Sequence, residues 1–360
     1  MLGAVLSAVN DLRLEQVATP SPGPGEVLLA VGATTLCGTD VRIMRGAKTQ
    51  GVATPVILGH ELAGHIAEVG PGVTEFTPGV AAALMPGIPC RRCWECTHDL
   101  ENACERLRIV GYSVDGGLAE YVLVPAESIE AGCLFTVEAD VGSEALALAE
   151  PLACAVTGQH AAPVEVGDTV LIMGAGPIGL LHLQLSRLSG ARTVIVSQPG
   201  AERRAHADRL GATVTVDPGS EDLAAVVGEH TGGRGVDVAI ICAGAVELVN
   251  EALLLCRTGG RVNIFAGLPG DGATPLHGNV VHYRQVSLAG SSNTRRRDYR
   301  TALDLIASGR VDTAGLVTHR YPLTEVAAAF DRVVAGDGLK VAVLPHGDRD
   351  AATPQGRDAP

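Results

Sequence analysis

The pattern of apolar and polar positions changes character near residue 166. Before it, apolar residues come in short runs rich in β-branched side chains, such as 26–31 and 119–124, with Pro and Gly between them. That pattern is typical of a barrel-like β domain with few helices. Beyond residue 166, short apolar strands alternate with stretches of helical length, which predicts a doubly wound parallel sheet.

The second region can be divided into individual elements. We expect strands at 169–173, 193–197, 213–216, 236–242 and 260–266, separated by helices at 177–189, 202–210, 221–230 and 246–257. A helix at 323–335 and a strand at 339–344 then return the chain to the first region. The predicted fold class is therefore α/β, with a β-barrel domain joined to a doubly wound parallel sheet.

These elements imply two domains, with the chain returning to the first domain after it has formed the second. We expect the barrel domain at 1–154 with a lobe at 90–104, the parallel-sheet domain at 155–295, the return segment at 296–345, and a disordered polar tail at 346–360.

Net charge and hydropathy limit the kinds of molecule that the protein is expected to bind. The formal net charge is −13, no apolar window is long enough to span a membrane, and the start of the chain has no basic segment that would mark a signal peptide. The basic cluster Arg295, Arg296 and Arg297 is expected to be a solvated turn. We therefore expect a cytoplasmic protein that binds neither nucleic acid nor membrane and works on small molecules.

Four cysteines lie close together in the sequence: Cys90, Cys93, Cys96 and Cys104. Four thiolates at such spacing can surround one tetrahedral Zn²⁺, and such a closed site holds a loop without doing chemistry. The alternatives are a coincidental cluster or disulfides, which a chain without a secretion signal rarely forms. The sequence predicts a structural zinc lobe.

A glycine-rich loop lies between the strand at 169–173 and the start of a helix. In this position such a loop indicates a dinucleotide-binding site. Its glycines permit a tight turn, a close approach to a pyrophosphate and close packing of helix on strand. The loop residues expected to contact a dinucleotide are Gly174, Gly176, Pro177, Ile178 and Gly179.

The end of the next strand bears on the choice of dinucleotide. An acid there would bind the adenosine ribose of NAD, but this strand ends in Ser197 and Gln198. Without that carboxylate a 2′-phosphate is not repelled, and Arg203 or Arg204 could pair with one. Arg203 could equally pack on adenine, or both could form an exposed helix face. The cofactor is thus predicted to be NAD or NADP.

A second metal site is suggested by one thiol, one imidazole and two carboxylates. They are Cys37, His60, Glu61 and Glu150, and they are dispersed along the chain as ligands of an open catalytic zinc site tend to be. Each alone would more often be a core or loop residue, but together with a dinucleotide fold they favour a metal.

The chain resembles the zinc-dependent medium-chain dehydrogenases, nearest the polyol (sorbitol) and threonine dehydrogenase branch, over residues 1 to about 345. The motifs that carry the resemblance are Cys37-Gly-Thr-Asp40, the run at 55–61, the four-cysteine lobe, the run at 115–121, Glu150-Pro-Leu and the glycine loop. It implies a GroES-like catalytic domain, a Rossmann domain, two zinc ions per chain, and hydride transfer between a secondary alcohol, or its ketone, and NAD(P).

The resemblance also assigns roles to single residues. It makes Cys37 and His60 zinc ligands, with Glu61 and Glu150 as a direct and an alternate or water-mediated ligand, and it favours Glu150 over Cys154. Thr39 is similar to the hydroxyl that passes on the alcohol proton. Asp40 fits an acceptor that orients the histidine. Tyr112 and Ile43 are expected in the substrate cleft or in the core, and relatives associate as dimers or tetramers through the strand matching 286–290.

Three departures from the family pattern leave substrate and cofactor open. Arg42 stands where relatives commonly have a relay histidine, and it cannot accept a proton in turnover. The segment 78–81 lacks a customary aspartate, and Gln198 replaces the ribose-binding acid. We expect a polyol, sugar alcohol or cyclitol as substrate. The alternatives are a threonine 3-dehydrogenase-like activity, with Arg42 as a conceivable carboxylate partner, or a silent zinc- and nucleotide-binding protein.

Overall fold

The computed structural model describes residues 1–270 and 272–347, so most of the predicted tail, residues 348–360, lies outside the described part. The chain divides into two compact units. The first holds Met1–Pro151, Thr294–Gly309 and the residues from Thr313 on, and the second holds Leu152–Asn293 with Arg310–Asp312. The boundaries fall at 151/152 and 293/294, where the sequence pattern predicted 154/155 and 295/296.

The first unit is built on a seven-stranded sheet and a smaller three-stranded one. In the large sheet β10, β6, β5, β3, β18 and β17 follow one another, and β9 pairs with β3 as well. Its strands are β3 (Val27–Thr35), β5 (Glu61–Val69), β6 (Ala81–Leu84), β9 (Tyr121–Val124), β10 (Leu134–Thr136), β17 (Val317–Pro322) and β18 (Lys340–Leu344). The small sheet has β2 (Asp11–Gln16), β1 (Leu2–Ala8) and β4 (Val56–Ile57).

The helices of the first unit are mostly short. They are α1 (Gly38–Met44), α2 (Trp94–Thr97), α3 (Ala126–Glu130), α4 (Ser143–Ala147), α11 (Arg296–Ala307) and α12 (Val326–Ala335), with 3₁₀ turns η1 (Glu101–Ala103) and η2 (Leu323–Glu325). A ribbon of β7 (Gly87–Ile88) and β8 (Arg108–Ile109) closes the base of the cysteine segment.

Period-two alternation explains the core of this unit. Val27, Leu29 and Val31 are alternate residues of β3, and all three are fully buried in one apolar cluster with Leu62 and Ile66 of β5. Side chains two apart on a strand share a face, so these residues fill one side of the sheet, and Leu28 and Ala30, which face the other side, are buried as well.

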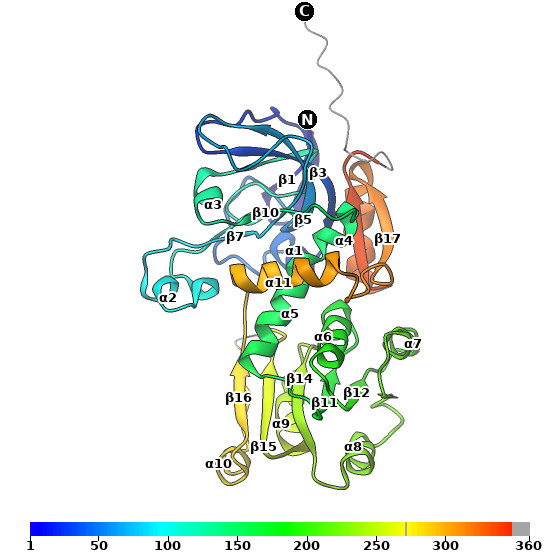
Figure 1. Cartoon of the computed structure of the whole chain (residues 1–360). Coiled ribbons are helices and arrows are strands. Elements are labelled where there is room, and N and C mark those ends of the chain that lie inside the picture. Colours follow the sequence, from blue (N-terminus) through cyan, green and yellow to red (C-terminus); the bar gives the residue numbers. More distant parts are fainter. Residues whose placement is uncertain (271, 348–360) are drawn as a thin grey trace, which may run out of the picture. The chain divides into compact units, whose positions relative to one another are not determined.

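The second unit contains one six-stranded parallel sheet in the order β13-β12-β11-β14-β15-β16 (Figure 1). This order, with the first strand in the middle and the chain winding outward on both sides, is that of dinucleotide-binding sheets. The strands are β11 (Thr169–Met173), β12 (Thr193–Ser197), β13 (Val214–Val216), β14 (Val236–Ile241), β15 (Cys256–Ile264) and β16 (Ser287–Gly290).

Helices connect these strands. They are α6 (Pro177–Leu188), α7 (Ala201–Arg209), α8 (Leu223–Thr231), α9 (Glu247–Leu255) and α10 (Gly278–Arg284), while α5 (Ala149–Ala161) begins in the first unit and ends in the second. Several predicted bounds are off by one or two residues, and two were wrong by three or more. Cys256 belongs to β15 and not to a helix, because the strand pairing with β14 reaches back to it, and residues 323–325 form a 3₁₀ turn ahead of α12. No helix among the described residues is long and apolar enough to cross a membrane.

Candidate metal and dinucleotide sites

Three of the four residues predicted around a catalytic metal meet at the end of the large sheet. The donor atoms of Cys37, His60 and Glu61 lie within 4.8 Å of one another. A thiol, an imidazole and a carboxylate are the donor types that zinc accepts in open sites, so the set fits the implied ion. Glu150 is not in this group, although its charge acts on Tyr112 and Lys340 and therefore lies nearby.

Strand pairing brings these residues together. Cys37 follows the end of β3 and precedes α1, whereas His60 and Glu61 begin β5, and Thr35 is the register partner of Glu61. Gly59 turns the chain into β5 with φ of +95°, and a Cβ there would lie 2.8 Å from the Thr34 side chain. Only glycine fits this turn, which is why the Gly-His-Glu run places its imidazole at the strand end.

Asp40 ties two of the three donors together. This fully buried carboxylate accepts a hydrogen bond from the Cys37 backbone N–H at 2.8 Å and contacts His60 Nδ1 at 3.1 Å. Burial opposes protonation of His60, but Asp40 outweighs it and raises the pKa of the imidazole well above its ordinary value. The contact matches the orienting role expected for Asp40 and leaves the other ring nitrogen for a metal.

Lys340 was missed in the sequence, yet it contacts Glu61 directly. Its ammonium group donates to both oxygens of the Glu61 carboxylate and to the Leu36 carbonyl at 3.3 Å, and Thr35 Oγ1 donates to Glu61 Oε2. The ion pair is almost completely buried. Burial opposes the charge on Lys340, but Glu61 and Cys37 raise its pKa above the usual value. No local motif could reveal this pair, because its members are 279 positions apart.

The other predicted residues of the site have separate surroundings. Thr39 is half-buried in the first turn of α1 and Arg42 is exposed on the same helix. Ile43 belongs to the apolar core, so its expected place is the core and not a cleft. Tyr112 packs its ring edge-on against His60, with 5.3 Å between ring centres, and Lys48 Nζ lies 5.3 Å from the centre of the Tyr112 ring.

The four-cysteine lobe also gathers its donors. The sulfur atoms of Cys90, Cys93, Cys96 and Cys104 lie within 4.8 Å of one another, which fits a tetrahedral Zn²⁺. Backbone N–H groups of Cys90 and Arg106 donate to the Cys104 sulfur at 3.3 and 3.4 Å. The backbone N–H of Arg92 lowers the pKa of Cys90 to about 6, which favours the thiolate that a metal needs.

The lobe reaches a distant helix through Glu101. A carboxylate oxygen of Glu101 in η1 accepts the backbone N–H of Arg296, the first residue of α11, at 2.6 Å. Arg295 donates through Nε to the Asn102 side chain at 3.3 Å. Arg295–Arg297 therefore stand at the capped start of a helix, and the expectation of a simple solvated turn was wrong.

The glycine loop in the second unit has the geometry of a phosphate-binding turn. Gly174 has φ of +108°, and a Cβ on Gly179 would lie 1.9 Å from the Gly174 carbonyl oxygen. A Cβ on Gly176 would meet only Arg203 Nη1, at 4.0 Å. The loop therefore packs tightly on one side and leaves room on the other, at the start of α6, where unpaired N–H groups suit a pyrophosphate.

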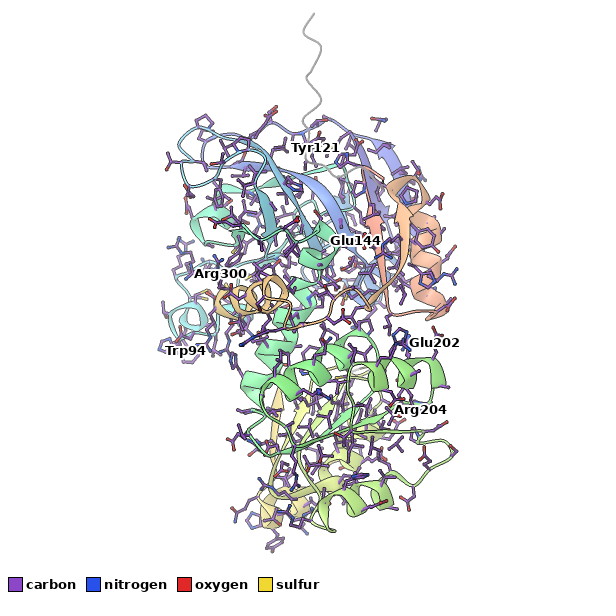
Figure 2. The ribbon with its side chains drawn as sticks, turned by 45° about the vertical axis from the view of Figure 1, so that its right-hand side comes forward. Trp94, Tyr121, Glu144, Glu202, Arg204 and Arg300 are labelled. Atoms are coloured by element: carbon purple, nitrogen blue, oxygen red, sulfur yellow. The ribbon has the colours of Figure 1, made fainter. Side chains whose placement is uncertain are left out.

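Gln198 and the two arginines of α7 have different partners. Gln198 Oε1 accepts the Ala175 N–H at 2.8 Å, so the residue in place of the customary acid is tied to the glycine loop. Arg204, which Figure 2 labels, donates to the Gln198 carbonyl at 2.7 Å and pairs with Asp217 at 3.2 Å. Arg203 instead lies beside the open face of Gly176, and it is therefore the better placed of the two for a cofactor phosphate.

Comparison with known proteins agrees with this picture. Residues 23–131 match the family model of the alcohol dehydrogenase GroES-like domain, and residues 177–308 match that of the zinc-binding dehydrogenase. The chain is 35% identical to L-threonine 3-dehydrogenase from Thermococcus kodakarensis over 93% of this chain and 95% of that protein. It is also 35% identical to D-arabitol-phosphate dehydrogenase from Enterococcus avium, over 93% and 94%.

A solved structure is equally similar. The Sinorhizobium meliloti protein, described as a zinc-binding dehydrogenase bound to NADP, superposes with a TM-score of 0.90 at 35% identity, over 96% of this chain and 99% of that one. The predicted fold class, a GroES-like domain with a Rossmann sheet, is thereby confirmed, as are the predicted dependence on zinc and on NAD(P).

Proposed function

The chain belongs to the zinc-binding alcohol dehydrogenase family, and on that basis we propose that it interconverts a secondary alcohol of a polyol, sugar alcohol or cyclitol and the corresponding ketone. The observation that carries the proposal is the meeting of Cys37, His60 and Glu61 in one unit that is followed by a complete dinucleotide-binding sheet. When bound, zinc supplies polarisation of the substrate oxygen, and the nicotinamide supplies a hydride acceptor.

The protein's own residues prepare that reaction. Asp40 holds the His60 ring and the Cys37 backbone, so both donors are fixed before any ligand arrives. Lys340 and Thr35 hold the Glu61 carboxylate, and Glu150 is the further proposed ligand. Thr39 Oγ1 is proposed to pass on the substrate's hydroxyl proton, accepting it while it gives up its own proton. Arg42 stays protonated, so the proton leaves through water.

Both metal sites are included in the proposal. Two zinc ions per chain are proposed, one at Cys37, His60 and Glu61 with Glu150, and one at the four cysteines of the lobe. No disulfide joins two cysteines among the residues that the structure describes, in keeping with the proposed place in the cytoplasm.

The surroundings of the glycine loop favour NADP. Gln198 brings no negative charge to the end of β12, and Arg203 lies beside Gly176. A neutral side chain and a guanidinium tolerate a 2′-phosphate, whereas a carboxylate at this position would reject it. Replacing Gln198 by Asp should therefore lower kcat/KM for NADP selectively. An unchanged ratio of NADP to NAD activity would refute this account of Gln198.

A second candidate is an alcohol that also carries an anionic group. Lys48, one of two lysines in the chain, stands over the Tyr112 ring, and Tyr112 contacts His60. The two curated relatives described above are named for L-threonine, which has a carboxylate, and for D-arabitol phosphate. Lys48 is better placed than exposed Arg42 to meet such a group.

One set of assays tests both candidates. Sorbitol, inositol, D-arabitol phosphate and L-threonine would be offered with NAD and with NADP, and the absorbance of reduced nicotinamide would be followed. Reduction with none of them would contradict the proposed substrates. Lys48→Met should lower kcat/KM for the charged substrates and spare sorbitol, whereas Arg45→Met, a matched loss of one exposed charge on the same segment, should change neither.

Assembly is proposed from family resemblance together with the edge of the parallel sheet. β16 (Ser287–Gly290) is the last strand of that sheet and covers most of the expected segment 286–290. An edge strand presents unpaired backbone groups that a second copy can pair with. A homodimer or homotetramer joined there is the expected state, and sedimentation velocity would measure it.

A further inference from the structure

The first unit contains a cavity that shares no residue with either proposed metal site. Its volume is about 470 Å³, and four arginines at the start of α11 line it. The remaining walls come from Asp99 and Glu101 in the lobe and from Gly132, Leu134 and Phe135 around β10. Figure 2 labels Arg300 on α11 and Trp94 in the lobe.

Most of these guanidinium groups lack a carboxylate partner. Arg297 lies 3.5 Å from Asp298, but no ion pair within 4 Å joins Arg295, Arg296 or Arg300 to an acid among the residues that the structure describes. By comparison, Arg204, Arg257 and Arg261 each pair with an acid. Arg296, Arg297 and Arg300 are exposed and Arg295 is half-buried, so solvent screens part of their mutual repulsion, and an anion in the cavity would reduce what remains.

The acids in the wall do not cancel this charge. Glu101 is occupied by the backbone N–H of Arg296, so it caps α11 and removes the helix terminus as an anion site. Asp99 is exposed on the lobe. Four arginines against two acids leave the lining with a net charge of +2. The side chains, and not the helix end, therefore define what the cavity would hold.

Two of the guanidinium groups are held in place by neighbours. Arg300 stacks over the Phe135 ring at 4.8 Å, and Phe135 stacks in turn on the buried Tyr299 ring at 5.1 Å. Arg295 is oriented by the Asn102 side chain. A guanidinium that stacks on a ring keeps its N–H fork free for a ligand and loses less entropy when it binds one.

We propose that this cavity is a binding site for a small phosphorylated molecule, in which Arg295 and Arg300 grip the phosphoryl oxygens. Arginine forks match phosphate oxygens two at a time, which a single lysine charge does not. The volume lies within the range of roughly 300–1,000 Å³ usual for small-molecule sites. Leu134 and Phe135 supply the apolar wall that the carbon part of such a ligand needs.

The test is a binding measurement on the full zinc-loaded chain, saturated with NADPH and in a parallel series with NADH, so that the glycine loop is filled and no hydride can leave glycerol 3-phosphate. Inorganic phosphate, glycerol 3-phosphate and glycerol are titrated by calorimetry. One saturable site per chain is expected for both anions and none for glycerol. Tighter binding of glycerol 3-phosphate identifies a phosphate ester as ligand, and equal binding identifies the free anion.

The Arg295→Gln/Arg300→Gln double variant should weaken phosphate binding at least about tenfold, because two charge-assisted contacts are lost. Arg13→Gln, which removes an exposed arginine elsewhere, is the matched control and should bind like the wild type. Arg300→Lys keeps the positive charge but loses the paired N–H donors of the guanidinium, so it should weaken binding less than the double variant does. It also provides a test if the double variant does not fold. Absence of saturable binding, or equal affinity in the wild type and in Arg300→Lys and the double variant, would overturn the proposal.

Discussion

The two proposed metal sites of the first unit collect their donors in opposite ways. The lobe takes four identical donors from one short segment, 90–104, whereas the other site takes three different donors from the ends of β3 and β5. The lobe can be recognised from spacing alone. The second site could be predicted only from dispersed residues taken together with the dinucleotide fold, and its donors meet because strand pairing sets Thr35 opposite Glu61.

The surroundings of the two sites differ as well. Around Cys37, His60 and Glu61 the structure already places Asp40, Thr35 and Lys340, each bonded to a donor residue. Around the lobe, α2 and η1 are single short turns, which cannot hold four thiols in place by themselves. We therefore expect metal to hold the lobe's fold together and to find the other site already formed.

Loss of a donor at the second site should have the largest effect on turnover. Cys37→Ser or His60→Ala should lower kcat/KM by more than the about 10- to 100-fold that follows loss of a group behind a ligand. Steady-state kinetics measures the loss, and calorimetry with NADPH should show unchanged cofactor affinity. Full activity in either variant would contradict the metal assignment, and the two sites would then not differ in their effect on turnover.

Loss of a lobe cysteine should act on stability. Cys93→Ser, or chelation of the lobe metal, should cost several kcal/mol, since structural zinc supplies about 10–16 kcal/mol of apparent binding energy in small zinc domains. Thermal unfolding measures this, and the fluorescence of Trp94, the single tryptophan, reports on the lobe itself. The kcat of the fraction that remains folded should equal that of the wild type. A large fall in that kcat would contradict the expectation that the lobe acts on stability and not on turnover.

Removal of Lys340 tests whether the second site is held by charge. In the metal-free protein, Lys340→Met leaves the Glu61 carboxylate buried without a cation and should cost about 3–5 kcal/mol of unfolding free energy. The double variant Lys340→Met/Glu61→Gln should recover much of that loss, because the uncompensated charge is gone. Urea unfolding of both measures the difference. Equal stability of the single and double variants would show that the pair does not hold the site.

The smallest effect is expected where the lobe meets α11. Glu101→Gln weakens the cap on the Arg296 N–H and should cost about 1 kcal/mol. Glu105→Gln removes an exposed acid of the same lobe and serves as the control. A loss in Glu101→Gln that disappears when the lobe metal is removed would show that the lobe stabilises α11. Identical melting temperatures for the two variants would argue against this.

Local patterns predicted much of the fold and part of the sites. Alternating strands and helices predicted the parallel sheet, because β11, β12 and β14 are short apolar runs bounded by turns, and the glycine loop marked its ligand end. The end of α9 was missed, since the segment around Cys256 reads as apolar helix until β14 pairs with it.

Long-range partners could not be predicted. Nothing around Lys340 in the sequence points to Glu61, and nothing around Arg295 points to Glu101 and Asn102. Such contacts are set by which strands and turns become neighbours, which a residue's own sequence neighbours do not encode. The arginine-lined cavity could not be predicted either, because its walls come from three separated segments.

The separation of Glu61 and Lys340 along the sequence also determines the order in which the two proposed metal sites are completed during synthesis. At about 5–20 residues per second a ribosome needs on the order of 14–56 s to add the 279 positions that separate them. The four thiols of the lobe are all present once residue 104 has emerged. Glu61, in contrast, waits for the last strand of the described chain before Lys340 can balance its charge. The nascent protein therefore completes the lobe within the first third of its synthesis and the other proposed metal site only near the end, and a chain that stops short of β18 can carry an intact lobe while the second site is unfinished.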